Sequence, residues 1–338
     1  MVDVLVTGGA GFIGSNFVRY ALARHADWRV TTLDKLTYAG RRENLHDVMD
    51  DPRHRFVHGD VTDAAVAGPL VRDSDIVVHF AAETHVDRSI LNAGEFITTD
   101  VFGTFVLLEA ARASSRLRRF VQISTDEVYG SIAEGSSRET DELRPRNPYS
   151  ASKAGADRLA YSYWATYGVP VIITRASNNY GPYQFPEKVI PLFVTNAVDD
   201  IQVPLYGDGL NERDWLHVDD HCRGVDLLID VATPGEVYNI GGGNDVRNVD
   251  LTHRILELAG KPTSLIRHVA DRPGHDRRYS LDTSKLRALG WAPEMDFHSG
   301  LAATVAWYRE NEWWWRPIKD GDPAFRSYYN TQYSERRS

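Results

Sequence analysis

Tyr149 and Lys153 lie four positions apart, a spacing that places both side chains on one face of a helix. An ammonium group beside a phenol favours the phenolate, so we expect Lys153 to lower the pKa of Tyr149 from about 10 toward the working pH. The phenolate could then accept a proton from a hydroxyl group while hydride leaves the same carbon. The pair predicts hydride-transfer chemistry; an exposed helix pair without chemistry is the alternative.

A polar run, Thr125-Asp126-Glu127, precedes this pair and directly follows an apolar stretch at residues 120–124. If that stretch is a strand, the run lies at its carboxyl end, the edge where open α/β sheets bind ligands. Adjacent carboxyl groups can act as separate acid and base when their environments separate the two pKa values. The alternative is structural: Asp126 would cap a short helix, with Glu127 in its first turn.

Three glycines near the start of the chain indicate a dinucleotide. Gly8, Gly11 and Gly14 follow an expected strand at residues 2–7 and open an expected helix at residues 14–24. The first permits a tight turn, the second lets the backbone approach a pyrophosphate, and the third lets helix and strand pack closely. An ordinary turn between a strand and a helix is the alternative.

An acidic residue, Asp34, ends the next expected strand. Its carboxylate can accept hydrogen bonds from both hydroxyls of a ribose and would repel a 2′-phosphate. We therefore expect NAD rather than NADP, although Lys35 and Arg41 nearby could accommodate a phosphate. Asp60 and Val61, after the following strand, are expected to contact the adenine.

The elements that must position these residues alternate in type. Short apolar runs predict buried strands at residues 4–6, 30–33, 55–57, 76–78, 120–123 and 171–173, with helix-like stretches such as 14–24 and 103–113 between several of them. Asn147 and Pro148 suit the N-cap and first position of the helix that carries Tyr149. The pattern predicts an α/β protein with a Rossmann-like, doubly wound parallel sheet.

The two halves of the chain differ in regularity. We expect residues 1–175 to form an NAD-binding domain, with later elements near residues 215–242 returning to it. Residues 176–338, which are richer in turn signals, are expected to form mainly a smaller, interleaved substrate lobe. Three consecutive tryptophans at residues 313–315 are interpreted as packing near the end of the chain.

The composition excludes several classes of function. With 38 Lys plus Arg against 47 Asp plus Glu, the net charge of −9 argues against nucleic acid and anionic lipid as partners. Cys222 is the only cysteine, which favours a reducing, cytoplasmic location. Because the chain opens with a strand-like run, we expect no signal peptide. No apolar run approaches the roughly 18 residues of a membrane span. The histidines show no metal-ligand spacing with the cysteine, so no metal site is expected.

Six segments carry a resemblance to a known family. Residues 7–14, 81–89, 124–130 and 149–153 resemble the extended short-chain dehydrogenases/reductases. Residues 178–188 and 208–220 narrow the resemblance to the dTDP-glucose 4,6-dehydratases. It extends from the first strand to about Trp315, and the tail from Arg316 matches nothing of use. Thr84 stands where many relatives carry serine, which retains the hydroxyl.

The resemblance implies a mechanism and a set of contacts. Tyr149 would deprotonate the glucose 4-hydroxyl as hydride passes to NAD, Glu127 would take the C5 proton, and Asp126 would protonate the leaving C6 hydroxyl. Thr125 would bind the oxygen at C4, and Lys153 the nicotinamide ribose. NAD contacts are expected from Gly8, Gly11, Phe12, Ile13, Gly14, Asp34, Lys35, Thr37, Asp60, Val61, Ala81, Ala82, Ser124, Tyr149, Lys153 and Asn178. Substrate contacts are expected from Thr84, Arg88, Thr125, Asp126, Glu127, Asn179, Lys188, Val189, Pro204, Tyr206, Arg213, Asn248, Arg272, His275 and Tyr279.

The resemblance places Arg213 and Arg272 at the pyrophosphate, where a guanidinium group can pair with phosphate through two hydrogen bonds. It places Tyr206 beside the base, on which an aromatic ring can stack. Relatives commonly form homodimers through two helices per subunit, matched here by residues 103–113 and 150–167.

Three other functions stay open: a nucleotide-sugar 4-epimerase or decarboxylating relative, a non-catalytic cofactor sensor, and a simple alcohol dehydrogenase. The pair Asp126-Glu127 argues against the epimerase, which has no use for acid and base at C5 and C6.

Overall fold

Seven parallel strands form the main sheet of the protein, which a computed structural model describes over residues 1–334. The strand order is β10-β6-β5-β4-β1-β2-β3. All six strands predicted from the sequence are present, and the predicted doubly wound parallel sheet is confirmed. The strands are β1 (Val2–Thr7), β2 (Trp28–Asp34), β3 (His54–His58), β4 (Ile76–His79), β5 (Arg119–Thr125), β6 (Val171–Ala176) and β10 (Val237–Ile240).

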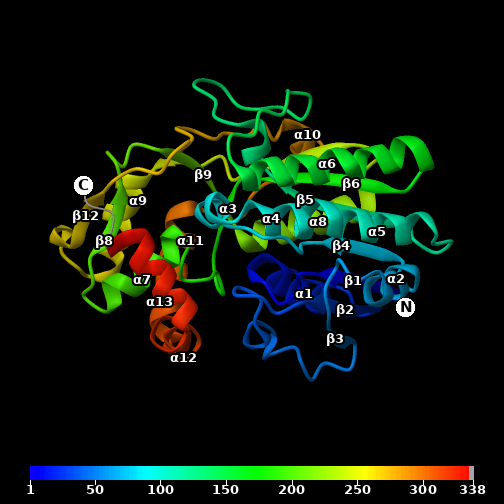
Figure 1. The fold of residues 1–338 in the computed structure, drawn as a ribbon, viewed down its shortest axis with the longest axis horizontal. Helices are drawn as coiled ribbons and strands as arrows, with labels where there is room; N and C mark the ends of the chain where they lie inside the picture. Colours follow the sequence, from blue (N-terminus) through cyan, green and yellow to red (C-terminus); the bar gives the residue numbers. More distant parts are fainter. Residues whose placement is uncertain (335–338) are drawn as a thin grey trace.

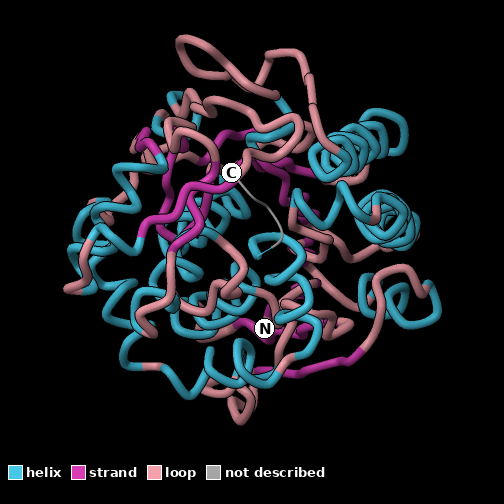
Figure 2. Tube along the Cα trace, turned by 60° about the vertical axis from the view of Figure 1, so that its left-hand side comes forward, coloured by secondary structure: helices cyan, strands magenta, loops and turns pink. Residues whose placement is uncertain are grey.

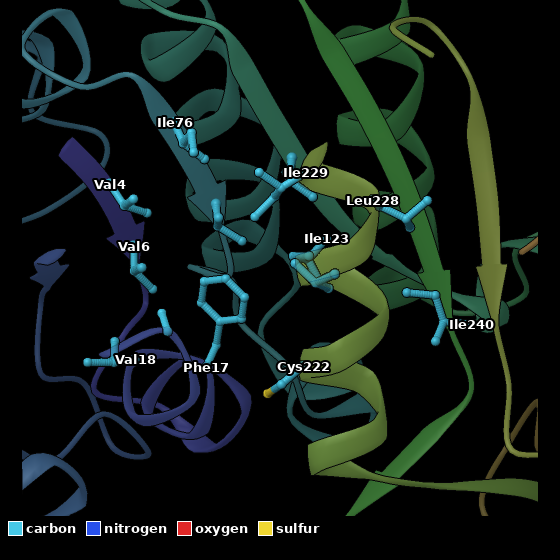
Figure 3. Close-up of a cluster of buried hydrophobic side chains, with 14 of the residues drawn as sticks. Val4, Val6, Phe17, Val18, Ile76, Ile123, Cys222, Leu228, Ile229 and Ile240 are labelled. Carbon is cyan, nitrogen blue, oxygen red and sulfur yellow. The ribbon is translucent and has the colours of Figure 1, made fainter. Parts of the chain in front are cut away.

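Helices cover both faces of this sheet, as Figures 1 and 2 show. One face carries α1 (Phe12–Arg24) and α8 (Val218–Val231), and the other carries α2 (Ala64–Arg72), α5 (Gly103–Arg112) and α6 (Pro148–Tyr167). Because side chains alternate along a strand, Val4 and Val6 of β1 join the first core whereas Leu5 joins the second. Figure 3 shows Phe17 of α1 and Cys222 of α8 meeting the strand residues of the first core.

A second lobe follows β6. It holds a three-stranded sheet of β7 (Asn178–Tyr180), β9 (Glu212–His217) and β11 (Asp245–Arg247), and a pair of β8 (Val203–Tyr206) and β12 (Ile266–Val269). Around them lie α7 (Val189–Val198), α9 (Asn248–Ala259), α11 (Phe297–Glu310), α12 (Glu312–Arg316) and α13 (Pro323–Tyr329). Between these elements, α8 packs on one face of the main sheet and β10 is its edge strand, so the chain passes from the second lobe back to the first.

Short elements complete the structure. They are α3 (Val86–Leu91), α4 (Ala93–Phe96), α10 (Ser284–Arg287), the 3-10 turns η1 (Arg42–Leu45), η3 (Asp126–Tyr129) and η4 (Thr263–Leu265), and the π-helical turns η2 (Ile97–Phe102), η5 (Pro317–Gly321) and η6 (Asn330–Ser334).

Two of the three consecutive tryptophans form part of the core of the second lobe. Trp314 and Trp315 are buried with Tyr308 of α11, whereas Trp313 is half exposed. Their interpretation as packing residues is therefore confirmed for two of the three. Within residues 1–334, no helix has the length and apolar character needed to cross a membrane.

Candidate active site

A cavity of about 270 Å³ lies at the carboxyl ends of the main strands, the ligand-binding edge of an open α/β sheet. Its walls bring together the glycine turn after β1, Asp34 at the end of β2, and the run Thr125-Asp126-Glu127 after β5. Tyr149 and Lys153 of α6 also line it. All sixteen residues expected to contact the cofactor, and all five expected catalytic residues, line this one cavity.

The glycine turn leaves no space for side chains. Gly8 has a φ of +68°, and a Cβ added there would lie 2.5 Å from the Ala81 nitrogen. A Cβ at Gly14 would lie 2.3 Å from the Gly8 carbonyl oxygen. Helix α1 begins just after Gly11, with no side-chain cap on its first N–H groups. Uncapped N–H groups at a helix N-terminus are suited to a phosphate.

The Asp34 carboxylate is buried and held by the backbone. One oxygen accepts from the Ala10 N–H at 2.9 Å and the other from the Leu36 N–H at 2.8 Å. Each oxygen keeps a second lone pair, which a ribose hydroxyl can use. The Lys35 ammonium is paired with Asp60 at 2.7 Å, and Arg41 lies 3.5 Å from Glu43. Both cations therefore have carboxylate partners, which favours NAD over NADP.

The run after β5 forms the 3-10 turn η3. Thr125, not Asp126, caps it: the Thr125 hydroxyl accepts from the Glu127 N–H at 3.3 Å and donates to Asp126 Oδ1 at 3.0 Å. Burial, together with the nearby charge of Glu127, raises the pKa of Asp126 well above its usual range. Among the described residues, Asp126 Oδ2 and Glu127 Oε2 are buried without a hydrogen-bond partner. A neutral acid and a second carboxyl group thus have oxygens available to a substrate.

Helix α6 starts where the sequence predicted. Asn147 is its N-cap, forms a capping box with Ser150, and is followed by Pro148. Lys153 Nζ donates to the Ile123 carbonyl at 2.7 Å. This contact holds the ammonium against the end of β5, inside the cavity wall.

The expected effect of Lys153 on Tyr149 was wrong for this structure. Burial, followed by the charges of Glu127 and Asp100, raises the pKa of Tyr149 well above 10 instead of lowering it. Burial also lowers the pKa of Lys153 itself. The spacing identified a nearby cation, but burial and the carboxyl groups of Glu127 and Asp100 determine the direction of the pKa shift of Tyr149.

Three groups beside the cavity, the buried Asp100 and His221 and the half-buried Glu83, were missed by sequence reasoning. Asp100 accepts hydrogen bonds from Ser152 Oγ at 2.6 Å and from the Glu83 N–H at 2.8 Å, and burial raises its pKa to about 6. Burial raises the pKa of Glu83, which lines the cavity, to about 7. His221 Nδ1 lies 3.0 Å from Asn179 Oδ1, and burial lowers the pKa of this histidine to about 4. Of the three, only Glu83 had a signal in the sequence, because it belongs to the segment 81–89 that carries part of the family resemblance.

The expected substrate residues divide into two groups. Thr84, Asn179 and Lys188 line the cavity with the catalytic residues. The others lie outside its lining: Arg88, Val189, Pro204, Tyr206, Arg213, Asn248, Arg272, His275 and Tyr279. Arg88 binds Glu187 at 2.9 Å, and the Asn248 N–H donates to the Asn211 carbonyl.

Five of these residues form what we call the outer cluster: Tyr206, Arg213, Arg272, His275 and Tyr279. The Arg213 guanidinium lies 4.4 Å from the centre of the Tyr279 ring, and the ring centres of Tyr206 and His275 are 6.0 Å apart. The charge of Glu127 acts on the pKa values of Arg213, Arg272 and Tyr279, so the cluster adjoins the cavity. Arg272 Nε is buried without a hydrogen-bond partner among the described residues.

The residues present fit NAD. The glycine turn has no space for a Cβ, and the first N–H groups of α1 have no side-chain cap, as a bound pyrophosphate requires. The Asp34 carboxylate keeps lone pairs that can accept hydrogen bonds from a ribose. Ser124 Oγ and Asn178 Oδ1, which belong to residues lining the cavity, are buried without a partner within residues 1–334. Over the same residues, no group of three His, Cys, Asp or Glu side chains is placed to hold a metal ion.

Comparison with known proteins gives a consistent result. A family model described as GDP-mannose 4,6 dehydratase matches residues 5–304. The chain is 55% identical to dTDP-glucose 4,6-dehydratase of Streptomyces antibioticus, over 94% of this chain and 96% of that protein. It is similar to the crystal structure of DesIV, a dTDP-glucose 4,6-dehydratase from Streptomyces venezuelae with NAD bound, at 55% identity and a TM-score of 0.92, covering 94% of this chain and all of that one. UDP-glucose 4-epimerase of Thermus thermophilus, with NAD, is 32% identical with a TM-score of 0.85, covering 91% of this chain and 99% of that one.

Proposed function

Because the chain belongs to the dTDP-glucose 4,6-dehydratases within the extended short-chain dehydrogenase/reductase family, we propose that it converts dTDP-glucose into dTDP-4-keto-6-deoxyglucose. The reaction uses NAD without net redox change and serves deoxysugar biosynthesis. The observation that carries the proposal is the meeting of Asp126 and Glu127 with Tyr149 in one cavity. A 4-epimerase has use for Tyr149 and Lys153 but none for this pair of carboxyl groups.

Each step has a residue suited to it. NAD, when bound, supplies a hydride acceptor for C4, a hydride donor for C6 and a positive charge that favours the Tyr149 phenolate. Tyr149 takes the proton of the 4-hydroxyl, and Thr125 binds the oxygen that becomes the ketone. Glu127 takes the C5 proton, which the ketone makes acidic, while Asp126 gives its proton to the C6 hydroxyl that leaves as water. Glu127 then returns a proton to C5 as C6 becomes a methyl group.

The raised pKa of Asp126 supports this division of roles. A carboxyl group kept neutral by burial can donate a proton at a pH where an ordinary aspartate is ionised. Lys153 donates to the Ile123 carbonyl and, in this proposal, binds the nicotinamide ribose. The outer cluster takes the nucleotide: Arg213 and Arg272 bind the pyrophosphate, and Tyr206 stacks on the base.

We assign residues 1–175, with α8 and β10, to NAD and residues 176–338 mainly to the nucleotide sugar. The protein acts in the cytoplasm as a homodimer formed through α5 and α6. Apolar side chains on this surface support the dimer, because Phe102, Phe105, Tyr161 and Tyr167 are all exposed there. Such a patch on a sheet-covering helix pair is typical of a protein interface.

The test is to incubate purified protein with dTDP-glucose, without and then with added NAD, and to identify the product by mass and NMR. Loss of one water, a ketone at C4 and a methyl group at C6, with no net NADH, are expected. An unchanged mass with inverted C4 would make the protein an epimerase. Net NADH release would make it an alcohol dehydrogenase, and NAD binding without any turnover of nucleotide sugars a sensor.

A further inference from the structure

The final part of the described chain packs against residues expected to bind the nucleotide. We call residues 323–334, which comprise α13 and η6, the C-terminal segment. It lies between β8 and α3 in Figure 1, where α13 is drawn in red. Tyr328, Gln332 and Tyr333 of this segment are buried. The segment belongs to the tail for which the sequence resemblance gave no role.

One contact joins the segment to the outer cluster through a chain of polar groups. Gln332 Nε2 donates to the Tyr206 hydroxyl at 2.6 Å. That hydroxyl donates in turn to Asp87 Oδ2 at 3.4 Å, and the same carboxylate oxygen lies 3.8 Å from Arg272 Nη1. The Tyr206 hydroxyl is therefore held on one side by the C-terminal segment and on the other by the partner of a cluster arginine.

Three further contacts fix the segment in this position. The Tyr333 ring centre lies 6.0 Å from that of Tyr206, and the Tyr333 carbonyl accepts from Arg267 Nη2 at 2.5 Å. The Arg88 guanidinium lies between two rings, 4.6 Å from the centre of Tyr328 and 3.9 Å from that of Tyr38, which lines the cavity. The segment thus touches both the outer cluster and a residue that packs on the cavity wall.

We propose that the C-terminal segment is part of the nucleotide site and that Gln332 is a positioning residue, which holds the Tyr206 ring in the orientation that stacks on the base. The inference rests on the proposed function, in which Tyr206 meets the base of dTDP. A ring whose hydroxyl is already fixed loses less conformational freedom when the base arrives, so binding is tighter. Gln332 acts through Tyr206 and has no part in the chemistry at the sugar.

The test compares Gln332→Met, which keeps the length of the side chain but not its amide, with Tyr206→Phe and with the double variant. Dissociation constants for dTDP, measured by calorimetry, and KM and kcat for dTDP-glucose are the readouts. One hydrogen bond lost corresponds to a rise of about 3- to 10-fold in the dissociation constant and in KM, with kcat changed less than about twofold. The double variant should bind about as weakly as the weaker single variant, since both remove the same contact.

Thr331→Ala is the matched control, because Thr331 is the exposed neighbour of Gln332 on the same turn. It should bind dTDP like the wild type. Unchanged binding and KM in Gln332→Met, or losses in the two single variants that multiply in the double variant, would overturn the positioning role. A wild-type protein that binds dTDP but does not dehydrate dTDP-glucose would overturn the proposed function instead, and one that does not bind dTDP would overturn both.

Discussion

Asp126 and Glu127 are neighbours in the chain, yet the structure gives them different surroundings. Asp126, the first residue of η3, is almost fully buried and accepts a hydrogen bond from the Thr125 hydroxyl. Glu127 is less buried; its charge acts on both arginines of the outer cluster, whereas that of Asp126 acts on Arg213. The geometry therefore supports one neutral acid and one base at a single strand end. If the two residues have these roles, removing the base should stop the reaction at a defined stage.

Glu127→Gln tests that stage. The amide keeps the size of the side chain but cannot accept the C5 proton, so product formation should fall by about 10²- to 10⁴-fold. Oxidation at C4 depends on Tyr149 and should persist. Enzyme-bound NADH should therefore accumulate in a single turnover, which is seen as a rise in absorbance at 340 nm. Glu134→Gln, an exposed change seven residues further on, should leave the rate unchanged. Normal product formation by Glu127→Gln would rule out its role as the base.

The buried carboxyl group of Asp100 should make the stability of the protein depend on pH. Its pKa is about 6 in the folded protein, against an ordinary value of 3.8, chiefly because it is buried. Between these two pH values the folded state binds more protons than the unfolded state, so this group lowers stability as the pH rises through that window. Asp100→Asn, which cannot ionise, should raise Tm at pH 8 by about 2–4 °C and by less at pH 5.

The control for this titration is Asp230→Asn, at the exposed end of α8. Its Tm should stay close to that of the wild type. A lower Tm for Asp100→Asn at pH 8 would mean that the hydrogen bonds from Ser152 and Glu83 contribute more than the buried charge costs.

At the scale of elements, the turn from β1 to α1 is the feature most dependent on residue size. The Cβ of Gly14→Ala would lie 2.3 Å from the Gly8 carbonyl oxygen and 2.8 Å from the Gly9 Cα, both of them backbone atoms that cannot rotate away. The helix must shift from the strand, which should cost about 1–3 kcal/mol and weaken NAD binding at least about tenfold. NAD titration and thermal unfolding measure both effects.

Gly94→Ala is the matched glycine control, since its added Cβ would meet nothing closer than Asn92 Oδ1 at 3.8 Å, and α4 is helical there. We expect unchanged NAD affinity and equal or higher stability. Equal NAD affinity in Gly14→Ala would show that the close approach of α1 to β1 is not needed for the cofactor.

The same turn explains why the NAD site was predictable. Strand residues such as Val4, Leu5 and Val6 are buried on both faces, and the glycines follow them directly, so local sequence determines both the strand and the turn. The raised pKa of Tyr149 was not predictable in this way, because it depends first on burial and then on the charges of Glu127 and of Asp100, which lies 49 residues away. The contact between Gln332 and Tyr206 spans 126 residues and leaves no local pattern.

At the scale of the whole molecule, the two faces of the main sheet differ. On one face, α8 is covered by α1 and by the segment that follows α10, and it leaves few large apolar side chains exposed. On the other face, α5 and α6 pack side by side, and Phe105, Tyr161 and Tyr167 of these helices are exposed together with Phe102 at the end of η2. A second copy placed on this surface would cover apolar side chains of both helices, and the resulting four helices would form one shared layer.

Phe105→Arg tests this arrangement. In a dimer formed through α5 and α6, the substitution places two charges in an apolar interface without partners, so the protein should become a monomer in light scattering after size exclusion. Val231→Arg is the matched control, because Val231 is also an exposed apolar residue but belongs to α8 on the opposite face, and it should leave the dimer intact. A wild-type monomer, or dissociation caused by Val231→Arg and not by Phe105→Arg, would contradict the interface. Dissociation by Phe105→Arg alone would assign assembly to the helix pair that carries Tyr149, so that the same element orders both the catalytic pair and the second subunit.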